Sequence, residues 1–266
     1  MNDSSFPSGP STPFVPPEQT PPPAPPRPPV RVSMPRATPY VTYSIIGVTV
    51  FVFVLQLATL LIAREDIPAR LFIKSNELIR AGQVWRLLTP ALLHDIHFPF
   101  LHILFNMYAA FIFGTELERH FGHGRFLLLY VLSAFAGNVM SFLFTDLPSL
   151  GASTAVFGLL AAEGIFLLQN RKLFAGQFRR AIGNIIFMAA INLFVIGSLP
   201  GIDNWGHIGG LLGGLIFTFF AGPNWEIEGI SPAYHLVDQR SGREVIVGAA
   251  IDVLIFGGLA MWGMTH

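Results

Sequence analysis

Long stretches of the chain are apolar and carry no charged residue. Such runs extend over residues 37–63, 126–145 and 181–202. About 20 apolar residues are enough for a helix to cross a bilayer. Apolar and polar residues do not alternate along these runs, as they would in a membrane β-barrel. The pattern therefore predicts an all-α polytopic membrane protein.

The same pattern predicts seven membrane-spanning helices, at residues 41–63, 99–117, 125–145, 152–169, 181–199, 205–222 and 245–264. Lysine and arginine occur before the first span and after the second, fourth and sixth, but not after the third, the fifth or the seventh. The positive-inside rule then places the N-terminus in the cytoplasm and the C-terminus outside. We expect an integral multi-pass protein of a bacterial plasma membrane, or of an organelle membrane with the same polarity.

The segment 64–96 departs from this charge pattern, because it carries five basic residues on the external side. It also holds four acidic residues and many apolar ones, among them Trp85, which suits the headgroup level of a membrane. We expect a folded amphipathic loop in the membrane interface. An error in the length of a span is the alternative.

The N-terminal segment differs in composition from the rest. Fourteen of the 21 prolines fall within the first 39 residues, and such a tract cannot build a core. We expect a disordered cytosolic tail at 1–40, a six-span core at 41–225, and a cytosolic loop with a seventh span at 226–266. The tail is not a signal peptide, because no basic region precedes an apolar one. It could bind a proline-recognition module, but no partner is identified.

Charge and cysteine content exclude several functions. The net charge is zero, so no nucleic-acid partner is expected, and the absence of cysteine excludes disulfides and thiol chemistry. No metal or cofactor is indicated. The expected surroundings are the lipid bilayer and transmembrane proteins.

A few polar residues interrupt the predicted spans, and such residues are costly and often functional. His102 and Asn106 lie one turn apart on the second span, Ser153 opens the fourth, and His207 lies near the start of the sixth. These three spans all run from outside to inside, so the polar residues lie at a similar depth. A serine beside a neutral imidazole is an activated nucleophile. An oxyanion could then bind the His102 ring, the Asn106 amide and the free backbone N–H groups at Ser153.

The sixth span carries closely spaced glycines in "NWGHIGGLLGG". Gly206 and Gly210 form one of three small-xxx-small pairs, which let helix backbones approach closely. The glycines could therefore hold His207 against Ser153. Taken singly, each feature favours a structural role: tight packing for the glycines, a helix N-cap for Ser153, a satisfied polar residue for His207. Their combination at one depth favours catalysis.

These residues resemble the rhomboid family of intramembrane serine proteases. The resemblance covers roughly residues 43–222, through "VWRLLTPALLH", "FLHILFNMYAAFIFGTELERHFG", "GASTAVFGLLAA" and "DNWGHIGGLLGG". It implies a six-helix core, a Ser153–His207 dyad and an acyl-enzyme, cleavage of transmembrane segments of proteins, and His102 and Asn106 as oxyanion donors. It also implies structural roles for Trp85 and Arg86 in the first loop. Glu118 resembles the family's buried acid, which ties the second and third spans together.

Two positions depart from the pattern of that family. Thr154 stands where glycine usually follows the serine, which makes the geometry around Ser153 less certain, and Gly206 replaces an alanine. Two acids in the spans, Glu163 and Asp252, are expected to be structural. Glu163 should face the bundle interior or the inner interface, and Asp252 should be interfacial or paired with a neighbour.

Two other functions remain possible at this point. A non-catalytic rhomboid-like protein could bind membrane helices, although such relatives lack the serine or the histidine. A transporter would show internal repeats and broken helices, and none is evident. For a protease, we expect the fifth span and the external loops, including "GSLPGI" at 197–202, to move and admit a substrate helix.

Overall fold

The computed structural model describes residues 37–96, 100–174, 176–230 and 233–266. Contacts divide the chain into two units, residues 1–31 and 32–266. The first unit, and with it most of the tail that is predicted to be disordered, lies outside the described residues. Everything below concerns the second unit.

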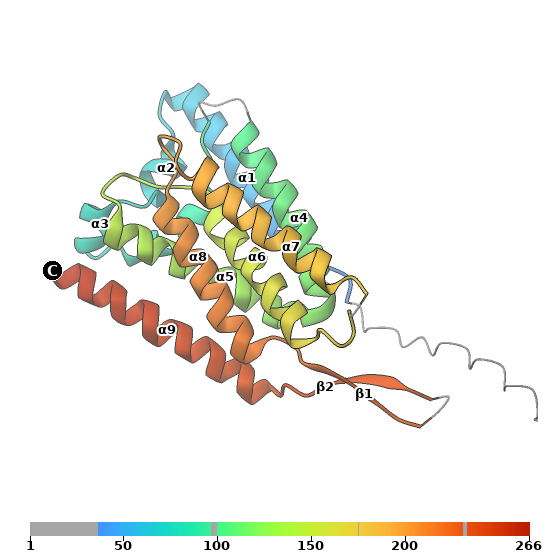
Figure 1. The fold of residues 1–266 in the computed structure, drawn as a ribbon. Helices are drawn as coiled ribbons and strands as arrows, with labels where there is room; N and C mark the ends of the chain where they lie inside the picture. The colour runs from blue at the N-terminus through green and yellow to red at the C-terminus, as the bar shows by residue number, and fades with distance from the viewer. Residues whose placement is uncertain (1–36, 97–99, 175, 231–232) are drawn as a thin grey trace, which may run out of the picture. The chain divides into compact units, whose positions relative to one another are not determined.

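Seven long helices occupy the positions of the predicted spans (Figure 1). They are α1 (Tyr40–Ala63), α4 (Leu101–Phe121), α5 (His123–Phe144), α6 (Ser153–Gln169), α7 (Phe178–Ala190), α8 (Asn204–Ala221) and α9 (Gly242–Thr265). A π-helix, η3 (Ile191–Ile196), continues α7. The helix ends lie within four residues of the predicted ones, when α7 is counted together with the π-helix that continues it to Ile196. The prediction of an all-α polytopic fold is confirmed.

Four of these helices are long and apolar enough to cross a membrane: α1, α5, α7 with its continuation to Ile196, and α9. Helix α6 is apolar but shorter. That α4, α6 and α8 also span the bilayer stays a prediction, which follows from their place in the same bundle.

The segment after α1 folds into short helices, as the sequence predicts. They are α2 (Ile67–Phe72), α3 (Asn76–Arg80), η1 (Val84–Leu87) and η2 (Thr89–Leu92). The Asp66 side chain caps α2 by accepting the backbone N–H of Ala69 at 2.9 Å. An error in span length therefore does not explain the charges of this segment, whereas its position in the membrane interface stays a prediction.

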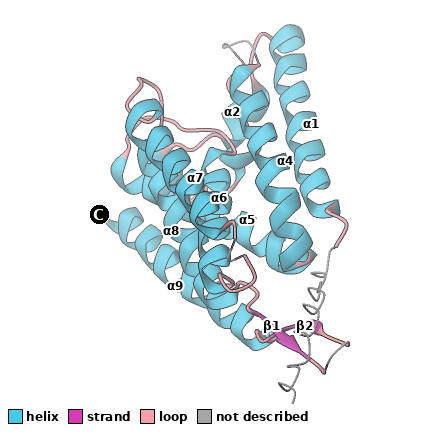
Figure 2. Ribbon diagram, turned by 45° about the vertical axis from the view of Figure 1, so that its right-hand side comes forward, coloured by secondary structure: helices cyan, strands magenta, loops and turns pink. Residues whose placement is uncertain are grey.

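A β-hairpin lies between α8 and α9, where the sequence predicts a loop. Strands β1 (Trp225–Glu228) and β2 (His235–Asp238) pair antiparallel, with Trp225 opposite Asp238 (Figure 2). Arg125 at the start of α5 donates hydrogen bonds to the Asp238 carboxylate and to the Arg240 carbonyl. The strands were missed because each has only four residues.

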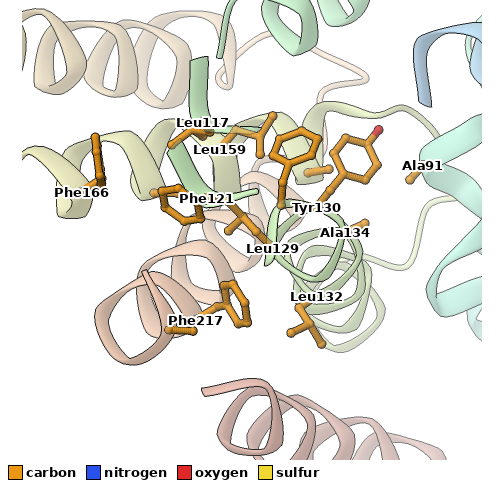
Figure 3. Packing of buried hydrophobic residues seen from close by; sticks show 14 residues of the cluster. Ala91, Leu117, Phe121, Leu129, Tyr130, Leu132, Ala134, Leu159, Phe166 and Phe217 are labelled. Atoms are coloured by element: carbon orange, nitrogen blue, oxygen red, sulfur yellow. The ribbon is translucent and has the colours of Figure 1, made fainter. Parts of the chain in front are cut away.

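The core lies where α5, α6 and α8 pack together. One cluster of buried side chains gathers Leu129 and Tyr130 of α5, Leu159 of α6 and Phe217 of α8 (Figure 3). Phe256 of α9 belongs to a second cluster, with Val139 and Phe142 of α5. Helix α7, in contrast, has no buried residue. The bundle is therefore tight around α5, α6 and α8 and loose at α7.

Candidate active site

Ser153 and His207 lie within hydrogen-bonding distance of each other. The Ser153 Oγ is 3.0 Å from the His207 Nε2, although 54 residues separate them in sequence. The His207 side chain is buried, and its ring stacks on Phe157 with 4.2 Å between centroids. The described residues offer no hydrogen-bond partner to its other nitrogen, Nδ1. Serine and histidine thus form a pair without a third, acidic member.

This contact depends on a very close approach of α6 and α8. A Cβ added to Gly210 would lie 1.9 Å from the Thr154 carbonyl oxygen, and one added to Gly214 would lie 2.2 Å from that of Gly158. No side chain fits at such distances. The small residues along α8 therefore set the helix spacing that brings His207 to Ser153, as the sequence predicts.

The Thr154 side chain fits beside the dyad because two neighbouring glycines leave room for it. A Cβ on Gly137 of α5 would lie 2.5 Å from the Thr154 Cβ, and one on Gly206 would lie 3.2 Å from its Cγ2. The threonine is buried, and Ser153 still contacts His207. The two departures from the family pattern therefore fit together in space.

The first loop positions the turn that precedes Ser153. Gly151 adopts a φ of +128°, which side chains disfavour, and its N–H donates to the Pro90 carbonyl at 3.0 Å. The next N–H, of Ala152, points at the His94 Nε2 at 3.4 Å. Burial, with help from nearby His102, lowers the pKa of His94 to about 3, so this ring is neutral and can accept. His94 ends the stretch "VWRLLTPALLH", but no pattern in the sequence indicates a role for it.

His102 and Asn106 lie next to this turn. A Cβ on Gly151 would be 2.9 Å from the His102 Nε2 and 3.7 Å from the Ser153 Oγ, so the imidazole and the hydroxyl flank the same glycine. The His102 Nδ1 accepts the Asp95 N–H at 3.4 Å, which places the proton of a neutral ring on Nε2. The Asn106 amide donates to the His102 carbonyl at 2.9 Å. His102, Ser153 and His207 therefore lie together, whereas the hydrogen bond of the Asn106 amide stays within its own helix.

Arg86 holds the first loop together from inside. Its guanidinium donates to the carbonyls of Ile73 at 2.6 Å and Arg70 at 2.8 Å, and its Nε donates to the Gln83 side chain. Trp85 is half-exposed and donates to the Leu71 carbonyl at 3.3 Å. Both side chains thus bind backbone carbonyls of the first loop, and their structural role stays a prediction.

Lys74 connects this loop to the turn before Ser153, and the sequence analysis missed it. The side chain is fully buried, and its Nζ donates to the carbonyls of Thr145 and Leu147 beyond α5. Its backbone pairs with Ser149. A lysine in a charged loop looks solvated in sequence, so no signal distinguished it.

Asp203 begins the helix that carries His207. Its Oδ1 accepts the Gly206 N–H at 3.0 Å and the Thr145 hydroxyl at 3.2 Å, which caps α8 and links it to α5. His207 is the fourth residue of α8, so this cap fixes the turn on which the imidazole sits.

Glu118 of α4 is fully buried and binds the start of α1. Its carboxylate accepts the N–H groups of Val41 and Thr42 at 2.8 and 2.7 Å, and the Thr42 hydroxyl at 2.7 Å. His123, the first residue of α5, contacts it at 2.6 Å. The acid thus reaches the third span, as the resemblance implies, and it makes more bonds to the first span, which the sequence analysis did not foresee.

The two remaining acids have different surroundings. Asp252 is buried and unpaired: the residue is 1% exposed, and neither carboxylate oxygen has a hydrogen-bond partner among the described residues. The expected pairing with a neighbour is therefore wrong, because no polar group of the described residues reaches this point of α9, whereas a position at the membrane interface stays a prediction. Glu163 lines a cavity between α4, α6 and α7.

A family model and two similar proteins all point to the same family. The family model described as the Rhomboid domain matches residues 81–224. The chain is 41% identical over 185 residues to Rhomboid protease GluP of Bacillus subtilis, a match covering 69% of this chain and 34% of that protein. It is 39% identical over 164 residues to RHOMBOID-like protein 1 of Arabidopsis thaliana, covering 61% of this chain and 39% of that protein. The chain thus spans between a third and two fifths of the length of these relatives.

Proposed function

Because the chain belongs to the rhomboid family, we propose that it is an intramembrane serine endopeptidase, with Ser153 as nucleophile and His207 as general base. The observation that carries this proposal is the 3.0 Å separation between the Ser153 Oγ and the His207 Nε2. A serine hydroxyl becomes an effective nucleophile when a neutral imidazole at this distance takes its proton.

The reaction proceeds in two halves. The Ser153 Oγ attacks the carbonyl carbon of the scissile peptide bond, and the His207 Nε2 takes the hydroxyl proton. When the C–N bond breaks, His207 gives this proton to the leaving amine, and the acyl group remains as an ester on Ser153. Water then attacks the ester with His207 again as base, which releases the acid and restores the hydroxyl. Stacking on Phe157 supports the orientation of the imidazole in both halves.

Three groups are proposed to stabilise the oxyanion that forms in each half. The His102 Nε2 and the Ser153 Oγ flank Gly151, which supports the ring N–H as one donor. No side chain caps the start of α6, so the backbone N–H of Ser153 is available as a second. The Asn106 amide, one turn below His102, is the third. Donors aimed at developing charge commonly contribute ~3 kcal/mol each to transition-state stabilisation.

The substrates are proposed to be transmembrane segments of other proteins. The loose packing of α7 supports entry from the side, between α4 and α7. The positive-inside pattern supports an orientation with the N-terminus in the cytoplasm and with Ser153 toward the outer face. If the N-terminus of the substrate is outside, its chain would then run from the scissile bond along α4 and α7 toward the cytoplasmic side.

Purified protein in liposomes with single-span reporter peptides tests this function. We expect the wild type to cleave a reporter, and Ser153→Ala and His207→Ala to lose that cleavage while remaining folded. Cleavage that survives either substitution would reject the dyad. A folded wild type that binds the reporters without cleaving any would favour a non-catalytic member of the family. Thr154→Gly is the third variant, because only a site disabled by the threonine should gain activity from it.

A further inference from the structure

A cavity of about 190 Å³ lies between α4, α6 and α7, apart from the site described above. This is many times the ~30 Å³ that one water occupies in the liquid, so the space can accept a side chain. Its lining is apolar at Phe113, Leu167 and Ile185, and polar at Glu116, Glu163 and Asn184. The cavity thus has a largely hydrophobic lining with a few polar groups, as binding sites for small organic groups do.

One oxygen of the Glu163 carboxylate lacks a partner. The Oε2 is shielded from solvent and has no hydrogen bond to any described residue, while the residue as a whole is partly exposed. Glu116 differs, because its carboxylate contacts Arg119 at 3.6 Å and His120 at 3.1 Å. A carboxylate in a membrane helix without a partner is unfavourable, and such groups commonly face a ligand or a path for one. The cavity therefore presents one carboxylate that a cation could pair with.

The position of Glu163 along α6 relates the cavity to the dyad. Glu163 follows Ser153 by ten residues, which at 1.5 Å per residue is roughly 15 Å further along the helix. The cavity thus lies below the nucleophile on the predicted cytoplasmic side. It lies between α4 and α7, the two helices proposed to flank an entering substrate, and α7 has no buried residue to close it.

We propose that this cavity is a substrate subsite, in which Glu163 pairs with the ammonium or guanidinium group of a lysine or arginine about ten residues C-terminal to the scissile bond. The inference rests on the function and the orientation proposed above. It adds a specificity determinant that acts far from the bond that breaks.

The charge of membrane proteins fits this arrangement. Lysine and arginine are enriched at the cytoplasmic ends of membrane spans. A substrate that is cut near its outer end carries such residues toward the inner half of the bilayer. Their long apolar stems pack against apolar side chains while the charged end reaches a polar group. The lining of the cavity offers both, through Phe113 and Ile185 on one hand and Glu163 on the other.

The test compares reporters that differ at one residue, in vesicles of phosphatidylcholine and phosphatidylglycerol, which bring no primary amine. Lysine, glutamine or leucine is placed in turn at each position from about 8 to 12 residues beyond the scissile bond. For one of these positions we expect the wild type to cleave the lysine reporter roughly fivefold faster than the glutamine one, as for an exposed or half-buried ion pair. Glu163→Gln should bring this ratio to about one, whereas the exposed control Glu226→Gln on the hairpin should leave it unchanged.

Two further measurements, on a charge-reversed variant and on an inactive one, test the same pairing. Glu163→Lys should shift the preference to a reporter with glutamate at the same position. The uncleaving Ser153→Ala protein should bind the lysine reporter more tightly than the glutamine one, by fluorescence transfer, even if no reporter is cleaved. Equal cleavage of lysine and glutamine reporters at every position would overturn the subsite while leaving the protease intact. A lysine preference that persists in Glu163→Gln would also overturn it.

Discussion

The Thr154 side chain occupies the space that a side chain at position 206 would need. Its Cγ2 lies 3.2 Å from where a Cβ on Gly206 would be, closer than side chains normally pack. Thr154 follows the nucleophile, and Gly206 precedes the base. Beside the tighter contacts at Gly210 and Gly214, this contact lies between the two residues that are adjacent in sequence to the dyad.

This relationship predicts that the two positions depend on each other. Gly206→Ala should gain less unfolding free energy than the ~1 kcal/mol that alanine gains over glycine at an open helix position, because the new methyl group meets Thr154 and the Asp203 carboxylate. The substitution should be more favourable in the Thr154→Gly background, which removes one of the two contacts. The coupling between the two positions is obtained by measuring unfolding in detergent and reporter cleavage for four proteins: the wild type, the two single variants and the double variant. Strictly additive effects would contradict the contact.

Gly210 is predicted to tolerate no side chain. The methyl group of Gly210→Ala would meet the Thr154 carbonyl at 1.9 Å, so α6 and α8 must separate. We expect a loss of about 3 kcal/mol or more in unfolding free energy and the loss of cleavage. Gly258→Ala on α9 is the matched control. Nothing lies within 4 Å of that position, so the helix should gain up to about 1 kcal/mol. A stable, active Gly210→Ala protein would refute the close approach.

Lys74 should make stability depend on pH in the alkaline range. Burial lowers the pKa of Lys74 from 10.5 to about 8, against the opposing effect of Asp203 and Asp146. Between these two pH values the unfolded chain binds a proton that the folded chain does not, so unfolding free energy should rise with pH. The rise expected from this group is about 1–3 kcal/mol between pH 8 and pH 10.5. Below pH 8 both states are protonated, and the contribution is flat.

Denaturation of the wild type and Lys74→Met across this range isolates the contribution of the lysine. The difference in unfolding free energy between the two proteins should change with pH only above about pH 8. A difference that is constant from pH 7 to pH 10.5 would show that the buried amine titrates normally.

Glu118 should be one of the most important carboxylates for stability. Glu118→Gln replaces a charged acceptor of three hydrogen bonds from Val41 and Thr42, so we expect a loss of about 1–3 kcal/mol in unfolding free energy. Glu116→Gln, on the same helix, changes a half-exposed carboxylate that contacts Arg119 and the buried His120, and it should cost less than about 1 kcal/mol. Equal costs for the two variants would contradict the role of Glu118 as the anchor of α1.

Locking α4 to α7 should block the entry of substrates. The natural chain has no cysteine, so Phe113→Cys with Ile185→Cys gives one defined pair on either side of the same cavity. A cleavable bifunctional thiol reagent should abolish most reporter cleavage, and reduction should restore it. The control pair, Phe220→Cys with Val247→Cys, joins α8 to α9 beside another cavity and should leave cleavage intact. Full activity with α4 and α7 locked would argue against lateral entry.

The sequence predicted the helices and the meeting of Ser153 with His207, because both follow from local patterns. Apolar runs of span length indicate membrane helices, and helix direction sets the depth of each polar residue. It did not indicate Lys74, whose burial depends on carbonyls more than seventy residues away. The missing partner of Asp252 also escaped prediction, because the surroundings of a buried side chain depend on the helices that pack against it. Nor could composition show that Thr154 and Gly206 compensate each other, since that contact joins two helices.

Helix α7 has no buried residue, whereas α5, α6 and α8 hold the core. Substitutions at exposed positions usually change stability by less than about 0.5 kcal/mol. The side chains of α7 can therefore change over evolutionary time with little effect on the dyad or on folding. The helix proposed to face the substrate is thus free to diversify, while the helices that carry Ser153 and His207 are constrained. New substrate preferences can then arise without a new fold.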